Sequence, residues 1–159
     1  MRRFGLAACV ALVGLLGQAG LAQQPAPGHP DAPDGQALFT GQQPLPAHLR
    51  NQDIALPPVA TRCVNCHLVR APDKQDGRLA AQSLGPVLDA AFLLTSQPCH
   101  GGPATAYAEG SFCRVLRTSV APSDIVIAQA MPQFDIADAQ CQALWHYLTA
   151  PRAHAKPQP

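Results

Sequence analysis

The chain has 159 residues, with 11 lysines and arginines against 10 aspartates and glutamates, and 17 prolines. This near-neutral balance provides no basic surface for nucleic acid or for an anionic membrane, so neither partner is expected. The length suits one domain of about a hundred residues with flexible ends, and the many prolines predict long irregular connections around a modest helical core.

The first 22 residues have the parts of a secretory signal peptide. Residues 1–3 (Met-Arg-Arg) are a positive start, residues 6–16 are apolar, and residues 20–22 (Gly-Leu-Ala) form a small-residue cleavage site. The apolar stretch is too short for a stable membrane span. We therefore expect residues 1–22 to be removed on export and the mature protein to be periplasmic, with no stable membrane span.

Mostly irregular structure is predicted before residue 63. Residues 23–33 form a proline-rich leader that should stay extended or disordered. A short helix should follow, with Asp34 as its N-cap and Gly41 at its end. Prolines interrupt residues 42–61, which are predicted to be mostly loop.

Residues 63–67 read Cys-Val-Asn-Cys-His, which is the attachment signature of c-type haem. On one helical turn the two thiols can reach the two vinyl groups of a porphyrin edge, while the next side chain directs its imidazole at the iron. We predict one covalent haem c, attached through Cys63 and Cys66, with His67 as an axial ligand of the iron. The motif is expected on a helix over residues 60–69.

Two other interpretations of the Cys-x-x-Cys pair compete with haem. A structural zinc site needs four ligands, and the chain has no second Cys-x-x-Cys pair or spaced histidine pair. A thioredoxin-like redox pair belongs near alternating strands and helices, and the surrounding sequence has no apolar β-branched runs. The histidine directly after the second cysteine favours haem.

Helices are predicted at four places after the motif. They span residues 90–96, residues 107 or 111 to 119, residues 124–130 and residues 137–148. The last is the clearest, because its apolar residues fall on one helical face: Cys141, Leu144, Trp145 and Leu148. A loose tail is expected over residues 151–159.

Met131 is the thioether that remains once Met1 is lost with the signal peptide. It lies in the sequence Ala-Met-Pro-Gln-Phe-Asp, directly before the final helix. A lone methionine is usually core filler. Here Pro132 stiffens the loop, and a thioether would complete a His/Met pair of axial ligands, which raises the haem potential. We predict Met131 as the second iron ligand.

Taken together, these motifs resemble the small monohaem class I cytochromes c. The order is Cys-x-x-Cys-His, then Gly-Pro-Val-Leu at residues 85–88, then Met-Pro-Gln-Phe at residues 131–134, then a helix that ends in Ala-Leu-Trp-His-Tyr-Leu. The resemblance implies that residues 34–150 form the cytochrome c domain. The implied fold is all-α, a small cytochrome c-like helical fold around one covalently attached haem, with long irregular loops.

The resemblance also implies two contacts. The carbonyl of Pro86 would accept a hydrogen bond from Nδ1 of His67, which would orient the ring and tune its basicity. The first helix would cross the last helix near the aromatic residues of the latter, at Trp145.

Three further cysteines are unusual for this family. Cys99 and Cys113 bracket a glycine-rich insert at residues 97–110, and a disulfide between them would staple it. Cys141 lies on the apolar face of the last helix, where a buried free thiol is expected. The pair Cys99-His100 does not make a second haem site, because Ser96 stands where the first thiol would be needed.

These features predict an electron carrier and not an enzyme, because two axial ligands from the protein leave no iron position for a substrate. Its partners would be redox proteins, namely a periplasmic dehydrogenase and an electron acceptor. Two alternatives stay open. One is a haem enzyme or gas-binding sensor with an open sixth position, and the other is a dedicated cytochrome subunit of a larger dehydrogenase.

Overall fold

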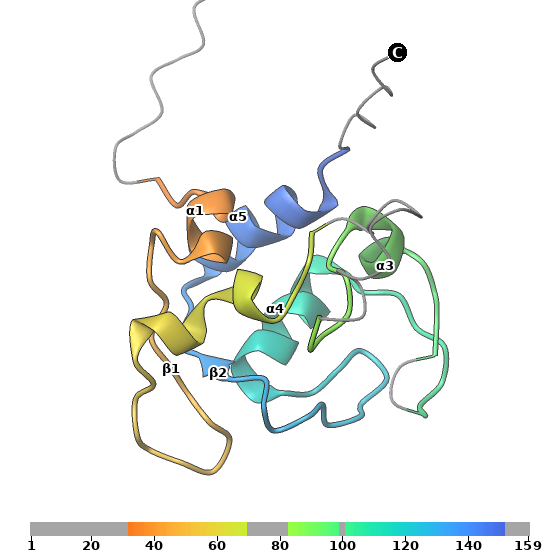
Figure 1. Ribbon diagram of the computed structural model, residues 1–159. Helices are drawn as coiled ribbons and strands as arrows, with labels where there is room; N and C mark the ends of the chain where they lie inside the picture. Colours follow the sequence, from red (N-terminus) through yellow and green to blue (C-terminus); the bar gives the residue numbers. More distant parts are fainter. Residues whose placement is uncertain (1–31, 70–82, 99–100, 152–159) are drawn as a thin grey trace, which may run out of the picture. The chain divides into compact units, whose positions relative to one another are not determined.

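The computed structural model of the protein describes residues 32–69, 83–98 and 101–151 (Figure 1). All of them belong to one compact unit, Asp31–Pro159. The predicted signal peptide, the leader up to residue 31 and the tail after residue 151 lie outside the described residues, as do Cys99 and His100. In the described ranges no helix has both the length and the apolar character needed to cross a membrane.

Short helices, two 3-10 turns and two short strands make up the regular structure of the described residues. In chain order they are α1 (Gly35–Thr40), β1 (Ala47–His48), η1 (Pro58–Thr61), η2 (Cys63–Asn65), α3 (Ala90–Leu94), α4 (Glu109–Thr118), β2 (Gln133–Phe134) and α5 (Asp138–Thr149).

The two strands pair as an antiparallel sheet, with Ala47 opposite Phe134 and His48 opposite Gln133. Figure 1 shows them next to each other at the lower left. The prediction of an all-α, cytochrome c-like helical fold is therefore wrong, because the described chain combines short helices with a sheet. Prolines keep much of residues 42–61 out of a helix, so backbone N–H and C=O groups of this segment are paired across strands instead.

The first helix, α1, begins and ends where the sequence predicts. Oδ1 of Asp34 accepts a hydrogen bond of 2.9 Å from the N–H of Gln36, which caps the N-terminus. Gly41 ends the helix in the left-handed conformation, with φ of 77°. A residue with a side chain is strained in that conformation, so glycine is favoured there.

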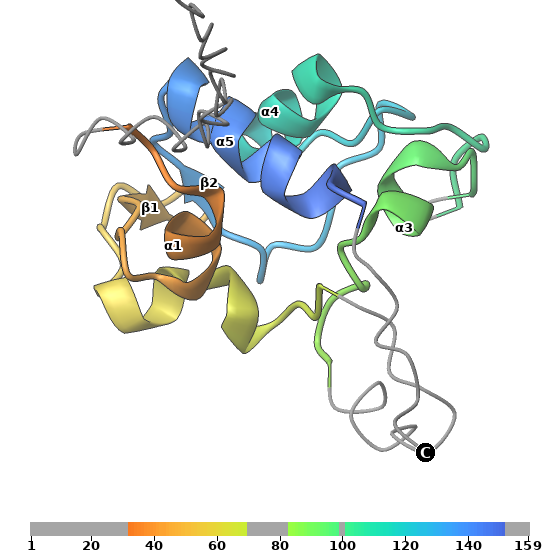
Figure 2. The same ribbon diagram turned by 90° about the horizontal axis from the view of Figure 1, so that it is seen from above.

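Helix α1 crosses α5 at close range because Gly35 has no side chain. A Cβ atom on Gly35 would overlap the carbonyl of Ala143 and lie 2.5 Å from Cβ of Tyr147. At the same crossing the ring centroids of Phe39 and Tyr147 are 5.9 Å apart. Figures 1 and 2 show the two helices side by side. Tyr147 thus supplies an aromatic ring at this crossing, where the family resemblance pointed to Trp145.

A disulfide between Cys113 and Cys141 joins α4 to α5, with the two Cα atoms 5.8 Å apart. The predicted pairing of Cys99 with Cys113 is therefore wrong. Cys141 is fully buried, as expected, but it is not a free thiol. Helices α4 and α5 pack against each other, with the ring centroids of Phe112 and Trp145 5.5 Å apart, and this packing brings Cys113 within bonding distance of Cys141.

The other helix predictions are confirmed in part. The helices predicted at residues 90–96, 107 or 111 to 119, and 137–148 are present as α3, α4 and α5. Residues 60–69 do not form the predicted helix, because Arg62 is extended (φ −74°, ψ 119°) between the two 3-10 turns. Residues 124–130 are not helical either, because Asp124 is left-handed, with φ of 58°, and Val126 is bridged to Val120.

The hydrophobic core is shared by the helices and β2. Its largest buried members are Leu38, Phe39, Leu45, Leu93, Phe112, Leu116, Phe134, Ile136, Leu144, Trp145 and Leu148. Burying an aliphatic or aromatic side chain of this size contributes about 1.5–3 kcal/mol to the free energy of folding. Most of these side chains also border the cavity described next, so packing of the core and shape of the cavity are linked.

Candidate cofactor site

An apolar cavity of about 280 Å³ lies against the core. Its walls come from Phe39 of α1, the turns at residues 60–67, residues 84–88, α3 with Tyr107, α4, residues 127–134, and α5. The structure brings together in this cavity the five residues that the sequence analysis assigned to a cofactor: Cys63, Cys66, His67, Pro86 and Met131.

The cysteine motif forms a tight turn on one wall. The carbonyl of Cys63 accepts hydrogen bonds from the N–H groups of Cys66, at 3.1 Å, and His67, at 2.9 Å. Both cysteines are free thiols. Burial raises the pKa of Cys63 to about 11; its backbone hydrogen bond lowers that pKa, and the neighbouring Cys66 raises it. Cys63 is therefore a protonated thiol at neutral pH.

His67 is buried, with 8% of its surface exposed, and its ring is held in one orientation. Nδ1 donates a hydrogen bond of 2.8 Å to the carbonyl of Pro86, as the family resemblance implied. Burial lowers the pKa of His67, and the hydrogen bond to Pro86 opposes that shift. The neutral imidazole is thereby favoured. With the proton on Nδ1, the lone pair on Nε2 is the one available to a metal.

Gly85 lies directly against the His67 ring, and sequence reasoning did not assign it to the site. A Cβ atom on Gly85 would lie 2.6 Å from Nδ1 of His67 and would overlap Cε1. The segment that carries Gly85 is fixed by two hydrogen bonds to the carbonyl of Cys66, from the N–H of Gly85 at 2.9 Å and from the hydroxyl of Ser83 at 2.8 Å. The signal that would have found it is the glycine directly before Pro86.

Met131 reaches the cavity from a turn directly before β2. Its N–H donates a hydrogen bond of 3.1 Å to the carbonyl of Ala128, and its side chain is partly buried against the core. Pro132 follows on the same wall. Met131 therefore lies on a turn, as a loop residue was expected to, but the helix predicted directly before it, over residues 124–130, is absent.

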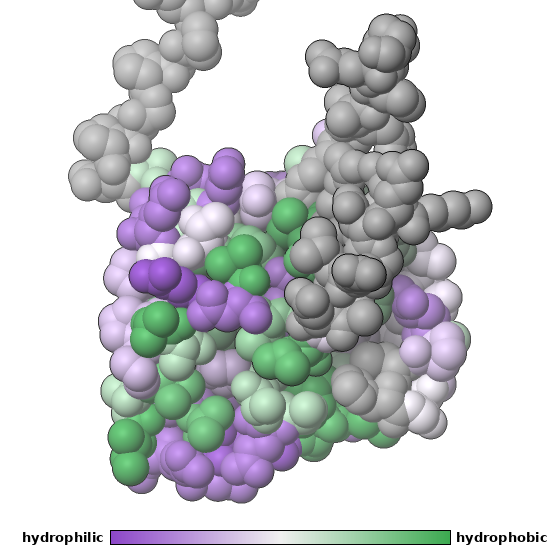
Figure 3. All heavy atoms as spheres, in the orientation of Figure 1, coloured by the Kyte–Doolittle hydropathy of each residue, from purple (hydrophilic) through white to green (hydrophobic). Residues whose placement is uncertain are grey.

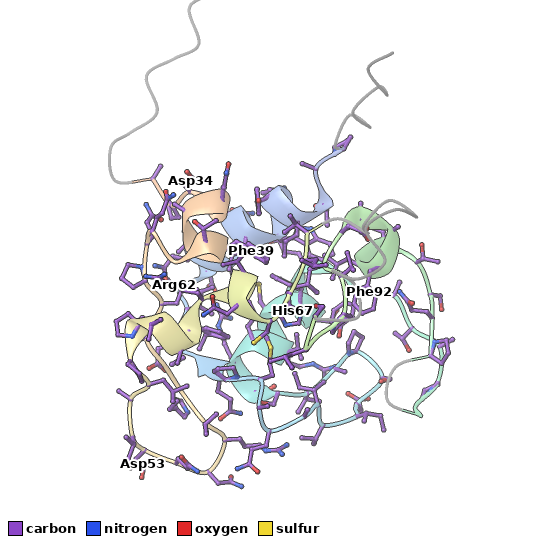
Figure 4. The ribbon with its side chains drawn as sticks, viewed as in Figure 1. Asp34, Phe39, Asp53, Arg62, His67 and Phe92 are labelled. Carbon is purple, nitrogen blue, oxygen red and sulfur yellow. A yellow bond between two sulfur atoms is a disulfide. The ribbon has the colours of Figure 1, made fainter. Side chains whose placement is uncertain are left out.

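Two aromatic residues of the cavity wall were also not assigned by sequence reasoning. The rings of Phe92 and Tyr107 have centroids 6.3 Å apart, and the N–H of Tyr107 donates to the carbonyl of Leu93 at 2.9 Å. Figure 4 shows His67 at the end of the motif segment, with Phe92 beyond it at α3 and Arg62 on the opposite side. Tyr107 lies in the insert, so part of the insert forms a wall of the cavity.

Exposed apolar side chains occur close to the motif. Val59 and Val64 are 60% and 46% exposed, and Leu84, which lines the cavity, is 86% exposed. Figure 3 shows hydrophobic residues interspersed with hydrophilic ones over this side of the molecule.

The groups that line the cavity fit a c-type haem. In the described ranges no three side chains of His, Cys, Asp or Glu are placed to hold a metal ion on their own. A haem brings four nitrogen ligands with it and needs axial ligands from the chain. The cavity offers two unpaired thiols, an imidazole and a thioether, and its other walls are mainly aliphatic and aromatic, as a porphyrin face requires.

None of the protein-family models, curated proteins or solved structures compared with this chain matches it.

Proposed function

We propose that the protein is an exported electron carrier with one covalently attached c-type haem. The observation that carries the proposal is the convergence of Cys63, Cys66, His67 and Met131 on one apolar cavity. These residues come from two segments far apart in sequence. A cavity that served only to fill space in the core would not need two unpaired thiols and an oriented imidazole on its walls.

Each of these side chains has a defined task in the proposal. Cys63 and Cys66 would hold the haem through two thioether bonds, each formed by adding a thiol S–H across a vinyl group, with the sulfur on one carbon and the hydrogen on the other. His67 and Met131 would be the ligands of the iron. When bound, the haem supplies an Fe(III)/Fe(II) couple through which one electron enters and leaves.

The remaining residues of the site set the environment. The Pro86 carbonyl keeps the proton on Nδ1 of His67 and orients the ring, which increases its strength as a ligand. The apolar walls exclude water, and exclusion of water together with a thioether ligand favours the reduced state. A protein with both axial positions filled by its own side chains transfers electrons and has no iron site for a substrate.

The proposed location is the periplasm, and the proposed partners are a dehydrogenase that donates the electron and a protein that accepts it. The test is expression with an export signal in a host that attaches haem c. The expected product keeps its haem after denaturation, gains the mass of one haem, and cycles reversibly between two oxidation states.

The matched variants are Cys63→Ser and Val64→Ala. The first removes a thiol and should reduce or abolish covalent haem; the second changes an exposed side chain inside the same motif and should leave the yield unchanged. A folded wild-type protein without covalent haem would contradict the proposal. Tight binding of carbon monoxide by the reduced protein would instead indicate the open-site alternative.

A further inference from the structure

Met131 lies on a segment that is fixed mainly at its two ends. Residues 128–132, here called the Met131 segment, contain a local hydrogen bond from the N–H of Met131 to the carbonyl of Ala128. The side chain of Gln129 also donates a long hydrogen bond, 3.4 Å, to the carbonyl of Arg50. Besides the packing of the Met131 side chain against the core, these are the hydrogen bonds that the segment makes among the described residues, so its position depends strongly on the elements before and after it.

The element before the Met131 segment is a tight hairpin over residues 119–127. Val120 is bridged to Val126, and the N–H of Ile127 donates to the carbonyl of Ser119 at 2.9 Å. The tip of the hairpin is held by one side chain of α4. Nη1 of Arg114 pairs with Oδ1 of Asp124 at 2.9 Å.

The same guanidinium makes a second contact with the hairpin. Nη2 of Arg114 donates to the carbonyl of Ala121 at 3.0 Å. Arg114 therefore holds a carboxylate and a backbone carbonyl of one turn at the same time. The hairpin leads at Ile127 directly into the wall of the cavity.

The element after the Met131 segment is held in the same way. β2 pairs with β1, and the N–H of Asp135 donates to the carbonyl of Pro46 at 2.9 Å. Beyond this point Nε of Arg117 donates to the carbonyl of Ile136 at 3.1 Å, and Nη2 pairs with Oδ1 of Asp138 at 2.6 Å. Arg117 thus holds a backbone carbonyl and a carboxylate, as Arg114 does.

We infer that Arg114 and Arg117 are positioning residues for Met131, because they hold the elements before and after its segment against α4. The two arginines are three positions apart on α4 and therefore lie on neighbouring parts of its surface. α4 is itself joined to α5 by the Cys113–Cys141 disulfide, so the helix that carries both arginines is fixed relative to α5. The inference rests on the proposed function, in which Met131 is an axial ligand.

The exposure of the two arginine–aspartate pairs indicates that they position the chain more than they stabilise the fold. The Arg114 and Arg117 side chains are 42% and 35% exposed, and the two aspartates that they pair with are 80% and 96% exposed. Ion pairs at such positions contribute little to the free energy of folding. Loss of either arginine should therefore leave the fold intact while releasing a backbone carbonyl, of Ala121 or of Ile136, in an element that flanks the Met131 segment.

The test uses the holoprotein and the variants Arg114→Ala and Arg117→Ala. An added ligand such as imidazole binds ferric iron when Met131 has left it, so its apparent affinity reports the population of that state. Each variant should bind imidazole about tenfold more tightly than the wild type. The weak near-infrared band that Met-to-iron coordination gives in the ferric state should lose intensity in parallel.

Matched variants separate the contacts. Arg114→Lys keeps the charge but cannot hold a carbonyl and a carboxylate with one planar group, so it should show a smaller shift in the same direction. Asp124→Asn weakens the ion pair alone and should stay close to the wild type. Gln142→Ala removes a surface contact of 3.5 Å between α5 and Glu109, away from both ends of the segment, and should bind imidazole as the wild type does.

The outcomes distinguish this inference from the proposed function. A wild-type protein that shows the near-infrared band, with wild-type imidazole affinity in both alanine variants, would overturn the positioning role and leave the proposed function intact. A wild-type holoprotein without the band would overturn His/Met ligation itself. Equal tightening of imidazole binding in Gln142→Ala would show that any loss of surface contacts has this effect, and would also overturn the positioning role.

Discussion

Gly85 and His67 are in contact through the face of the imidazole ring, and any side chain at position 85 would occupy space that the ring now fills. The same ring is held from its Nδ1 side by the carbonyl of the next residue, Pro86, at 2.8 Å. Two consecutive residues therefore fix both the position and the orientation of His67. This relationship makes position 85 a sensitive place to test the site.

Gly85→Ala should displace the His67 ring and destabilise the protein. Inserting a methyl group into a filled site costs about 1–3 kcal/mol, and the group that must move is the proposed iron ligand. We expect a lower melting temperature and an altered visible spectrum in the holoprotein.

Gly110→Ala is the control, because a Cβ there meets nothing within 4 Å. Gly110 lies in the first turn of α4, so that change should not destabilise the protein. Equal stability of the two variants would contradict the packing described at His67.

Met131→Ala should abolish the near-infrared band of the ferric protein and lower the reduction potential, since the thioether is the ligand that raises it. Covalent haem should remain, because its proposed attachment is through Cys63 and Cys66. Optical spectra and a redox titration measure both effects. Leu84→Ala, which changes another wall of the cavity at an exposed position, should keep the band. Survival of the band in Met131→Ala would rule out this methionine as the ligand.

The Cys113–Cys141 disulfide should make a large contribution to stability. The two cysteines are 28 positions apart, and the chain-entropy model gives about 3–4 kcal/mol for a closed loop of that size. Peptide mapping without reductant should recover Cys113 joined to Cys141. The double change Cys113→Ala and Cys141→Ala should lower the free energy of unfolding by a similar amount. Recovery of Cys113 joined to Cys99 instead would refute the pairing.

The close crossing of α1 and α5 gives a further prediction. Gly35→Ala should destabilise the protein more than Gly85→Ala, because the obstructing atoms at Gly35 include the backbone carbonyl of Ala143, which cannot turn aside as a side chain can. Chemical denaturation of both variants measures the difference. A Gly35→Ala protein as stable as the wild type would mean that the two helices do not approach as closely as described.

Helices α1 and α5 were predictable because their signals are local. Asp34 and Gly41 mark the ends of α1, and the spacing of Leu144 and Leu148 marks the buried face of α5. The sheet had no such signal. Each strand is two residues long, which is too short to show an alternating pattern, and its partner lies far along the chain.

The candidate site also has some features with a local sequence signal and others that depend on contacts between distant segments. The residues of the Cys-x-x-Cys-His motif are adjacent in sequence, so their grouping was evident from the start. The partner of Cys113 depends on how α4 is rotated against α5, and no pattern of spacing states that rotation. The place of Gly85 beside His67 depends on hydrogen bonds between two separate segments, so the sequence marks Gly85 as the glycine before Pro86 but not as a contact of the His67 ring.

The pairing of Ala47 with Phe134 has a consequence for how the molecule is assembled. Together with the contact of α1 on α5, it means that the first structured elements of the chain can be completed only by the last ones. A polypeptide is synthesised from its N-terminus, so Cys63 and Cys66 emerge well before the strand and helix that close the cavity over them. The thiols are then accessible on an open chain. The long-range contacts that enclose them form last, when the free energy gained from those contacts exceeds the entropy cost of closing the loop.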